Sequence, residues 1–218
     1  MRSIWRRGTY IGLAGAIFAA GGVAHKFISD FRANNSAFAE YIEARTAHMR
    51  AFPHRGAIVM LGDSITEGGD WQAIFPGVDI VNRGISASTT TDIIGRLDTV
   101  LASHPRQVFV MLGTNDLVYG VEERETLANM RKIVKTLHES AADVVVQSPP
   151  HSKNVQIERG ISRLAVAYRQ LCEQEPCRFV LTEIPASMTW DGIHLTPDGY
   201  RIWADVIRPY LLLGQSAS

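Results

Sequence analysis

Residues 57–69 read AIVMLGDSITEGG, an apolar run followed at once by small and polar residues. The run covers residues 57–61, carries no charge and includes β-branched side chains, which is typical of a strand buried on both faces of a parallel sheet. Open sheets of this kind place their ligands at the carboxyl ends of the strands. The polar residues that follow the run are therefore candidates for a functional site.

Four more short apolar runs follow, at residues 78–81, 108–112, 144–146 and 179–184. The segments between them have the apolar spacing of helices. The last helix is predicted to begin after Thr196 as N-cap, with Pro197 at its first position. Strands alternating with helices predict an α/β fold, with a parallel sheet of mostly five strands covered on both faces. Two long helices are expected to bury one stripe each, formed by Leu127, Met130, Ile133, Val134 and Leu137 in the first and by Ile157, Ile161, Leu164, Tyr168 and Leu171 in the second.

The composition limits the class of protein. The chain has 218 residues, of which 46% are hydrophobic and 20% charged, a mixture that suits one globular domain and argues against disorder, a collagen-like repeat or a coiled coil. Its 22 basic and 22 acidic side chains cancel, so it has no long-range field to attract nucleic acid. Two cysteines are too few for a disulfide scaffold or a four-thiolate zinc site.

The beginning of the chain has the pattern of a targeting segment. Arg2, Arg6 and Arg7 precede an uncharged stretch over residues 8–24. This pattern predicts that residues 1–24 are a signal peptide or a retained membrane anchor, and that the protein is extracytoplasmic, either periplasmic or secreted. A helical segment is expected over residues 25–55, where Pro53 and Gly56 end the helical pattern. The main domain then covers residues 56–213, and residues 214–218 form a tail.

Cys172 and Cys177 have four residues between them and stand just before an apolar run. In an oxidising compartment this spacing is compatible with a small local disulfide. Two unpaired small core residues are equally compatible with it.

Polar clusters stand where three strand runs end and the last helix begins: GDSIT at residues 62–66, NRG at 82–84, GTND at 113–116 and DGIH at 191–194. Each alone is a weak signal, because Asn and Gly often make turns and Asp63 with Ser64 could cap a helix. Four in this order are far more specific. From residue 56 onward the chain resembles the SGNH hydrolase superfamily, or GDSL esterases, and Glu67, Gly68 and Trp71 resemble its small acetylhydrolase-like and lysophospholipase-like branches.

The resemblance implies a flavodoxin-like three-layer α/β/α sandwich and ester hydrolysis by a serine nucleophile, Ser64. A serine hydroxyl needs a base to take its proton, and His194 is the candidate. Asp191, three residues earlier, can hold the imidazole in the required tautomer and stabilise its charged form. By resemblance, the oxyanion hole consists of the backbone N–H groups of Ser64 and Gly84 and the side-chain amide of Asn115. Glycine at 84 would let the backbone approach the substrate closely.

The other polar candidates have simpler interpretations. None of the six remaining histidines has an acid at a useful spacing, and only His151, which follows the fourth strand run, is expected on the functional edge, either lining the substrate site or simply solvated. Asp63 and Asp116 are expected to accept hydrogen bonds from backbone N–H groups and fix their loops. No histidine pair stands at metal-ligand spacing, so neither a metal nor a cofactor is expected.

The sequence therefore predicts a serine esterase that forms an acyl-enzyme, with a small-molecule or glycan ester as substrate and a preference for short acyl chains or O-acetyl groups. One alternative is an O-acetyltransferase that uses the same triad and passes the acyl group to a sugar hydroxyl, because the acceptor is chosen by access to the pocket. Another is a non-catalytic module that binds a carbohydrate or a partner. The sequence leaves the oligomeric state open.

Overall fold

The computed structural model describes residues 36–211, with side chains from residue 39 onward. The predicted signal peptide or anchor (1–24), the first part of the expected helical segment (25–35) and the tail (214–218) lie outside the described residues. Within residues 36–211 no helix is both long and apolar enough to cross a membrane. Within the remaining residues of that segment, the structure has the helix α3, Ser36–Ala51.

Five parallel strands form one sheet in the order β2-β1-β3-β4-β5, which is the flavodoxin-like order. The register aligns their carboxyl ends, because Gly62 at the end of β1 pairs with Gly84 of β2 and with Met111 of β3. The expected five-stranded sheet is thus confirmed, and the polar clusters that follow β1 and β3 meet at one edge. The strands are β1 Ile58–Gly62, β2 Ile80–Gly84, β3 Gln107–Met111, β4 Asp143–Gln147 and β5 Arg178–Val180.

The second and fifth strands depart most from the sequence prediction. The cluster at 82–84 does not follow the second strand but forms its last three residues, because they continue the ladder beside β1. The fifth run was expected to be a strand to residue 184, yet β5 ends at Val180. The reason lies in its neighbour: β4 is followed within three residues by Pro149 and Pro150, which have no N–H to continue a ladder.

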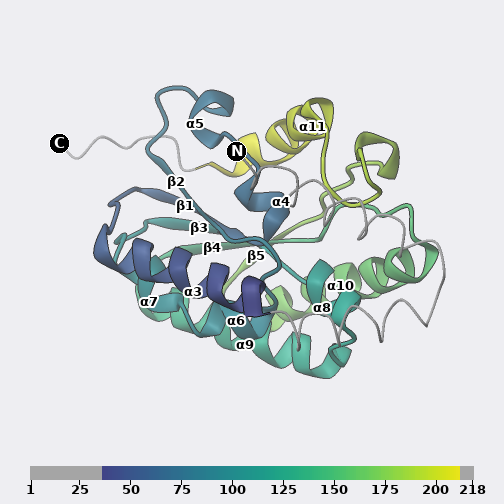
Figure 1. The fold of residues 1–218 in the computed structure, drawn as a ribbon, viewed down its shortest axis with the longest axis horizontal. Helices are drawn as coiled ribbons and strands as arrows, with labels where there is room; N and C mark the ends of the chain where they lie inside the picture. The colour runs from purple at the N-terminus through teal and green to yellow at the C-terminus, as the bar shows by residue number, and fades with distance from the viewer. Residues whose placement is uncertain (1–35, 212–218) are drawn as a thin grey trace, which may run out of the picture.

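Helices cover both faces of the sheet and complete the three layers (Figure 1). Alternate strand residues point to opposite faces, so Val59 and Leu61 belong to the core under the long helices, whereas Ile58 and Met60 belong to the core under α5 and α11. The predicted stripe of α9 and the last three residues of the stripe of α10 belong to the core under the long helices. The first two residues of the α10 stripe, Ile157 and Ile161, are buried in a smaller cluster with Val118. The helices after α3 are α4 Ser64–Glu67, α5 Trp71–Ile74, α6 Thr90–Ile94, α7 Leu97–Leu101, α8 Thr114–Tyr119, α9 Glu123–Glu139, α10 Val155–Gln174 and α11 Pro197–Ile207, with 3-10 turns η2 Ala186–Met188 and η3 Arg208–Tyr210.

The two cysteines form a disulfide, which decides between the two interpretations left open by the sequence. It joins Cys172 near the end of α10 to Cys177 just before β5. The bridge therefore closes a short turn at the amino-terminal end of an edge strand, away from the strand ends that carry the polar clusters.

Candidate active site

The nucleophile stands at the first position of a short helix directly above the end of β1. Asp63 is the N-cap of α4, and its Oδ1 accepts a hydrogen bond from the Ile65 N–H at 2.9 Å. Gly62 must be glycine, because a Cβ there would lie 2.0 Å from the hydroxyl of Thr66 and 2.7 Å from the Met111 carbonyl. The sharp passage from strand to helix leaves Ser64 at the functional edge of the sheet.

The structure brings the three predicted triad residues together. Ser64 Oγ lies 2.9 Å from His194 Nε2, although the two residues are 130 positions apart. On the other side of the ring, His194 Nδ1 lies 2.6 Å from Asp191 Oδ2. Asp191 Oδ1 accepts the N–H groups of Ile193 at 2.9 Å and His194 at 2.7 Å. The arrangement is an unbroken relay from a carboxylate through an imidazole to a hydroxyl.

The charge of Asp191 determines which nitrogen of His194 carries the proton. Partial burial tends to raise the pKa of Asp191, but the hydrogen bond from the His194 ring and the two backbone N–H groups outweigh it, so the pKa lies below its usual value. An ionised carboxylate only accepts hydrogen bonds, so His194 Nδ1 carries the proton. In the neutral ring Nε2 then presents a lone pair to Ser64, as a general base requires.

Asp63 and Asp116 fix loops, as predicted. Burial raises the pKa of Asp63 to about 6, opposed by the Ile65 N–H and by the nearby charge of His194. Asp116 accepts the backbone N–H of Thr90 at 3.1 Å and its hydroxyl at 2.5 Å, which ties the start of α6 to α8. Burial raises the pKa of Asp116 as well.

The expected oxyanion donors differ in the hydrogen bonds that they already make within the protein. Asn115 lies in the first turn of α8, with its side-chain amide 3.0 Å from the Ser88 carbonyl and 3.4 Å from Asp63 Oδ2. The Gly84 N–H, however, donates to Asn82 Oδ1 at 2.8 Å and is occupied. Position 84 needs glycine for packing rather than for access to a substrate, because a Cβ would lie 2.2 Å from the backbone nitrogen of Glu67.

Two features of the site were not predicted from the sequence. Trp190 has 58% of its surface exposed and stacks on the imidazole of His194, with ring centroids 5.6 Å apart and planes at 20°. Trp190 directly precedes Asp191 in the sequence, and this position could have indicated that it lies at the site. Ala87, in the turn after β2, has a left-handed φ of 64°, and no sequence signal marks it because alanine rarely adopts this conformation.

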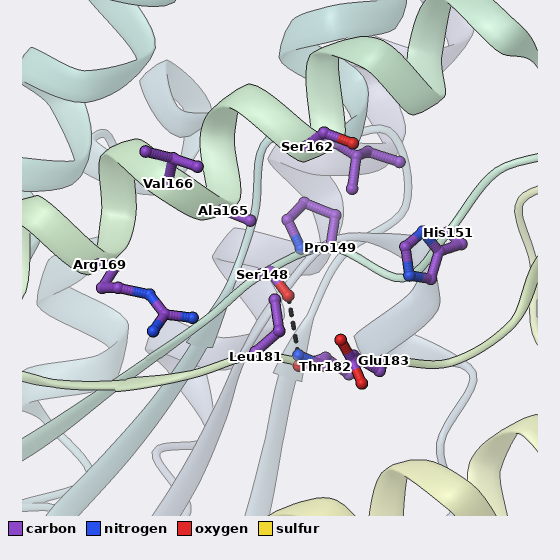
Figure 2. Close-up of a pocket in the computed structure, with 11 residues that line it drawn as sticks. Ser148, Pro149, His151, Ser162, Ala165, Val166, Arg169, Leu181, Thr182 and Glu183 are labelled. Atoms are coloured by element: carbon purple, nitrogen blue, oxygen red, sulfur yellow. Dashed lines mark hydrogen bonds between the residues drawn. The ribbon is translucent and has the colours of Figure 1, made fainter.

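The prediction that His151 lacks an acid partner is wrong. Its Nδ1 lies 2.7 Å from Glu158 Oε1. The loop after β4 folds back onto the first turn of α10, so seven residues of separation still give contact. His151 also lines a pocket of about 240 Å³, in which α10 forms one wall and the chain after β5 the other (Figure 2). The pocket is lined by Ser148, Pro149, His151, Ile161, Ser162, Ala165, Val166, Arg169, Leu181, Thr182 and Glu183.

No group of three or more His, Cys, Asp or Glu side chains within residues 36–211 is arranged to hold a metal ion. The groups that the triad presents are a hydroxyl, an imidazole and a carboxylate. Such a set can transfer an acyl group by nucleophilic attack assisted by a general base.

Comparison with solved structures supports the fold. A structure from Streptococcus pneumonia matches with a TM-score of 0.75 at 23% identity, covering 83% of this chain and 97% of that one. A GDSL-like lipase from Bacteroides thetaiotaomicron matches with a TM-score of 0.66 at 21% identity, covering 79% and 97%. At these identities the matches show a shared fold.

Sequence comparison adds the family. An arylesterase from Vibrio mimicus is 26% identical over 165 residues, which is 65% of this chain and 80% of the relative. An acetylxylan esterase from Geobacillus stearothermophilus is 26% identical over 162 residues, or 61% and 73%. The family model for the GDSL-like lipase/acylhydrolase family matches residues 60–202, a range that contains the whole triad. The chain therefore belongs to the GDSL-like lipase/acylhydrolase family, within the SGNH hydrolases, and is a carboxylic ester hydrolase of that type.

Proposed function

We propose that this protein hydrolyses esters of short acyl chains or O-acetyl groups through a covalent acyl-enzyme on Ser64. The observation that carries the proposal is the relay in which Ser64 Oγ lies 2.9 Å from His194 Nε2 and His194 Nδ1 lies 2.6 Å from Asp191. A hydroxyl in such contact with an oriented imidazole is the activated nucleophile of acyl transfer.

In the first half-reaction, Ser64 Oγ attacks the ester carbonyl carbon while His194 Nε2 takes the hydroxyl proton. The carbonyl oxygen becomes an oxyanion, and Asp191 stabilises the imidazolium. The carbon–oxygen bond to the alcohol then breaks, His194 gives its proton to the departing oxygen, and the acyl group stays on Ser64. In the second half, water attacks the acyl carbon with His194 again as base, and the acid leaves as Ser64 recovers its proton.

The oxyanion requires preorganised donors. Ser64 N–H and the Asn115 amide are two, as the resemblance implies. Because the Gly84 N–H is bonded to Asn82, we assign the third role to the N–H of Ala87 instead. Ala87 lies in the turn between Ser86 and Ser88, and Asn115 donates to the Ser88 carbonyl, so this turn borders the same space.

The preference for acetylated sugars is supported by two observations. Trp190 presents an exposed aromatic ring beside His194, where the alcohol part of the ester must leave, and such rings pack well against the apolar face of a pyranose. One relative is an acetylxylan esterase. A sugar O-acetyl ester places the ring to be recognised on the alcohol side.

We also propose an extracytoplasmic location, with residues 1–24 as a signal peptide or membrane anchor. The support is the basic and then apolar pattern of these residues, together with the disulfide between Cys172 and Cys177, since disulfides persist in oxidising compartments. A reporter fused after Lys26 should appear outside the cytoplasm, and its retention inside the cytoplasm would contradict the proposal.

The test of the mechanism is labelling with a fluorophosphonate followed by peptide mapping. The label should attach to Ser64, and Ser64→Ala should lose both labelling and turnover. Asn115→Ala should keep its fold but lose about 10²–10³-fold in kcat with little change in KM, because it removes one oxyanion donor. A label on Ser86 or Ser88, or wild-type turnover by Ser64→Ala, would overturn the assignment.

The substrate preference needs its own assay. A series of p-nitrophenyl esters of increasing acyl length should show the highest kcat/KM for acetate, and acetylated xylo-oligosaccharides should release acetate. Transfer of acetyl groups to added sugars in preference to water would instead establish an O-acetyltransferase. A pure protein that neither labels nor hydrolyses any ester would favour a binding module.

A further inference from the structure

Glu67 connects three segments around the nucleophile that are distant in sequence. It follows Ser64 by three residues and is the last residue of α4. Its Oε2 accepts two hydrogen bonds from Ser86, one from the backbone N–H at 2.8 Å and one from the hydroxyl at 2.5 Å. Its Oε1 accepts the hydroxyl of Tyr41 at 2.7 Å and lies 3.5 Å from Arg45 Nε. The carboxylate is thus surrounded by donors on both oxygens.

Tyr41 and Arg45 belong to α3, which lies before the residues matched by the family model, 60–202. The helix lies in the same layer as α6, α7 and α9 (Figure 1). Its other end is fixed separately, because Arg50 binds Asp98 at 2.6 Å and the Gly95 carbonyl at 3.2 Å. Packing of α3 therefore does not depend on Glu67 alone, and the contact with the nucleophile helix is an additional one.

The turn held by Glu67 passes close to Ser64. At its start, Ile85 N–H donates to the Gly62 carbonyl, and Gly84 packs directly against the backbone of Glu67. At its end, the Ser88 carbonyl accepts the amide of Asn115. The turn therefore spans from α4, where Ser64 stands, to the Asn115 amide of the oxyanion hole.

Within this turn Ala87 is buried and has a φ of 64°. A left-handed conformation is unfavourable for a residue with a side chain, and it persists only where surrounding contacts hold it. The two bonds from Ser86 to Glu67 stand immediately before this residue and restrain the preceding peptide and side chain. No hydrogen bond within residues 36–211 occupies the Ala87 N–H, so this donor is available to a substrate.

We propose that Glu67 is a positioning residue, which holds the turn at Ser86 so that the Ala87 N–H points at the oxyanion. Tyr41 orients the Glu67 carboxylate, and through this contact α3 contributes to catalysis. The inference rests on the proposed acyl-enzyme mechanism. Loss of these contacts should weaken binding of the tetrahedral state and leave binding of the ester almost unchanged.

The test is a comparison of kcat and KM for p-nitrophenyl acetate among four variants. Glu67→Gln places an amide against donors and should lower kcat by about 10–100-fold with KM within about twofold, as small misplacements of catalytic groups do. Tyr41→Phe and Ser86→Ala should each lower kcat by about fivefold, the factor expected for one hydrogen bond. Arg50→Ala loosens the opposite end of α3 and should leave kcat unchanged, so it controls for general loss of packing.

Two further readouts separate positioning from stability. A trifluoromethyl ketone, which forms a tetrahedral adduct on the serine, should lose affinity in Glu67→Gln in proportion to kcat. The double variant Tyr41→Phe/Ser86→Ala should lose less than the product of the single losses, because both act through Glu67. Wild-type kcat in Glu67→Gln, or an equal loss in Arg50→Ala, would overturn this inference while Ser64 labelling still upheld the mechanism. Absence of Ser64 labelling in the wild type would overturn both.

Discussion

Two acid–histidine pairs lie on the same edge of the sheet, and their inner geometry is nearly the same. His194 Nδ1 lies 2.6 Å from Asp191, and His151 Nδ1 lies 2.7 Å from Glu158. The two imidazoles are similarly exposed, with 36% and 43% of their side-chain surfaces open to solvent. The loops that carry them also touch, since Ser152 donates to the Gly192 carbonyl at 3.0 Å.

The two pairs differ in the groups that contact the histidine and the acid from outside the pair. His194 Nε2 meets Ser64, and Trp190 covers one face of its ring. Asp191 is held by two backbone N–H groups, whereas Glu158 is more exposed and accepts one, from Ser152. Within residues 36–211 no serine hydroxyl bonds to His151. An acid beside a histidine is therefore insufficient for nucleophilic catalysis, and the group on the far nitrogen decides the function.

The largest difference is expected when each histidine is removed. His194→Ala should lower kcat by about 10⁴–10⁶-fold, because Ser64 loses its base. His151→Ala should change kcat by less than about threefold, since no reacting group depends on it. Steady-state kinetics with p-nitrophenyl acetate measures both, with circular dichroism as the control for folding. Comparable losses in the two variants would mean that His151 also acts on the substrate.

Substitution of the two acids, Asp191 and Glu158, should likewise affect kcat much more in the catalytic pair than in the other pair. Asp191→Asn should lower kcat by about 10³–10⁴-fold, because an amide does not hold the required tautomer of His194. Glu158→Gln should leave kcat nearly unchanged and lower the free energy of unfolding by about 0.5–1 kcal/mol, as for a partly exposed pair. Urea unfolding and kinetics on the same samples would show this. A Glu158→Gln variant with greatly reduced kcat would remove the distinction between the pairs.

The pH dependence of stability should distinguish a buried acid from the acid of the catalytic pair. Asp63 has a pKa raised to about 6, so between about pH 4 and 6 the folded state keeps a proton that the unfolded state has lost. This carboxyl should make the free energy of unfolding fall as pH rises through that window, by up to about 3 kcal/mol. The lowered pKa of Asp191 acts in the opposite sense, so its contribution is lost as pH falls through the folded-state pKa.

Urea unfolding of wild type and Asp63→Asn from pH 4 to pH 7 measures the Asp63 effect. The difference in unfolding free energy between the two proteins should change across the window and level off above it. A constant difference would show that Asp63 ionises as it does in the unfolded chain.

The smallest effect is expected at Trp190, the ring that only the catalytic pair possesses. Trp190→Ala should lower kcat/KM for acetylated xylo-oligosaccharides about tenfold, mainly through KM, because one aromatic contact with the sugar is lost. Ethyl acetate, which has no ring to pack, should be hydrolysed nearly as before. Trp190→Phe serves as the matched control and should keep most of the glycan activity. An equal loss on both substrates would mean that Trp190 orients His194 rather than the sugar.

The sequence predicted the parts of this site that depend on local patterns. Ser64 stands in a short motif at the end of β1, and Asp191 and His194 stand in a short motif just before α11. Open parallel sheets place functional groups at the carboxyl ends of their strands, so these motifs were expected at one edge. Three features depend on contacts between distant segments and could not be predicted in that way: the bond from Tyr41 to Glu67, the return of the chain that pairs His151 with Glu158, and the occupation of the Gly84 N–H by Asn82. The end of β5 at Val180 depends on the two prolines that follow its neighbour β4.

The loop that holds Asp191 and His194 is closed on itself, by a bridge between Thr189 and Leu195 and a bond from Trp190 N–H to the His194 carbonyl. These contacts span few residues, so this half of the relay costs little loop entropy to form. Ser64 joins it only across 130 positions, through a sheet whose first strand must already be paired. During folding the hydroxyl therefore stays an ordinary alcohol until the two ends of the domain meet. The rate at which Ser64 gains reactivity toward a phosphonate would thus time the completion of the native topology.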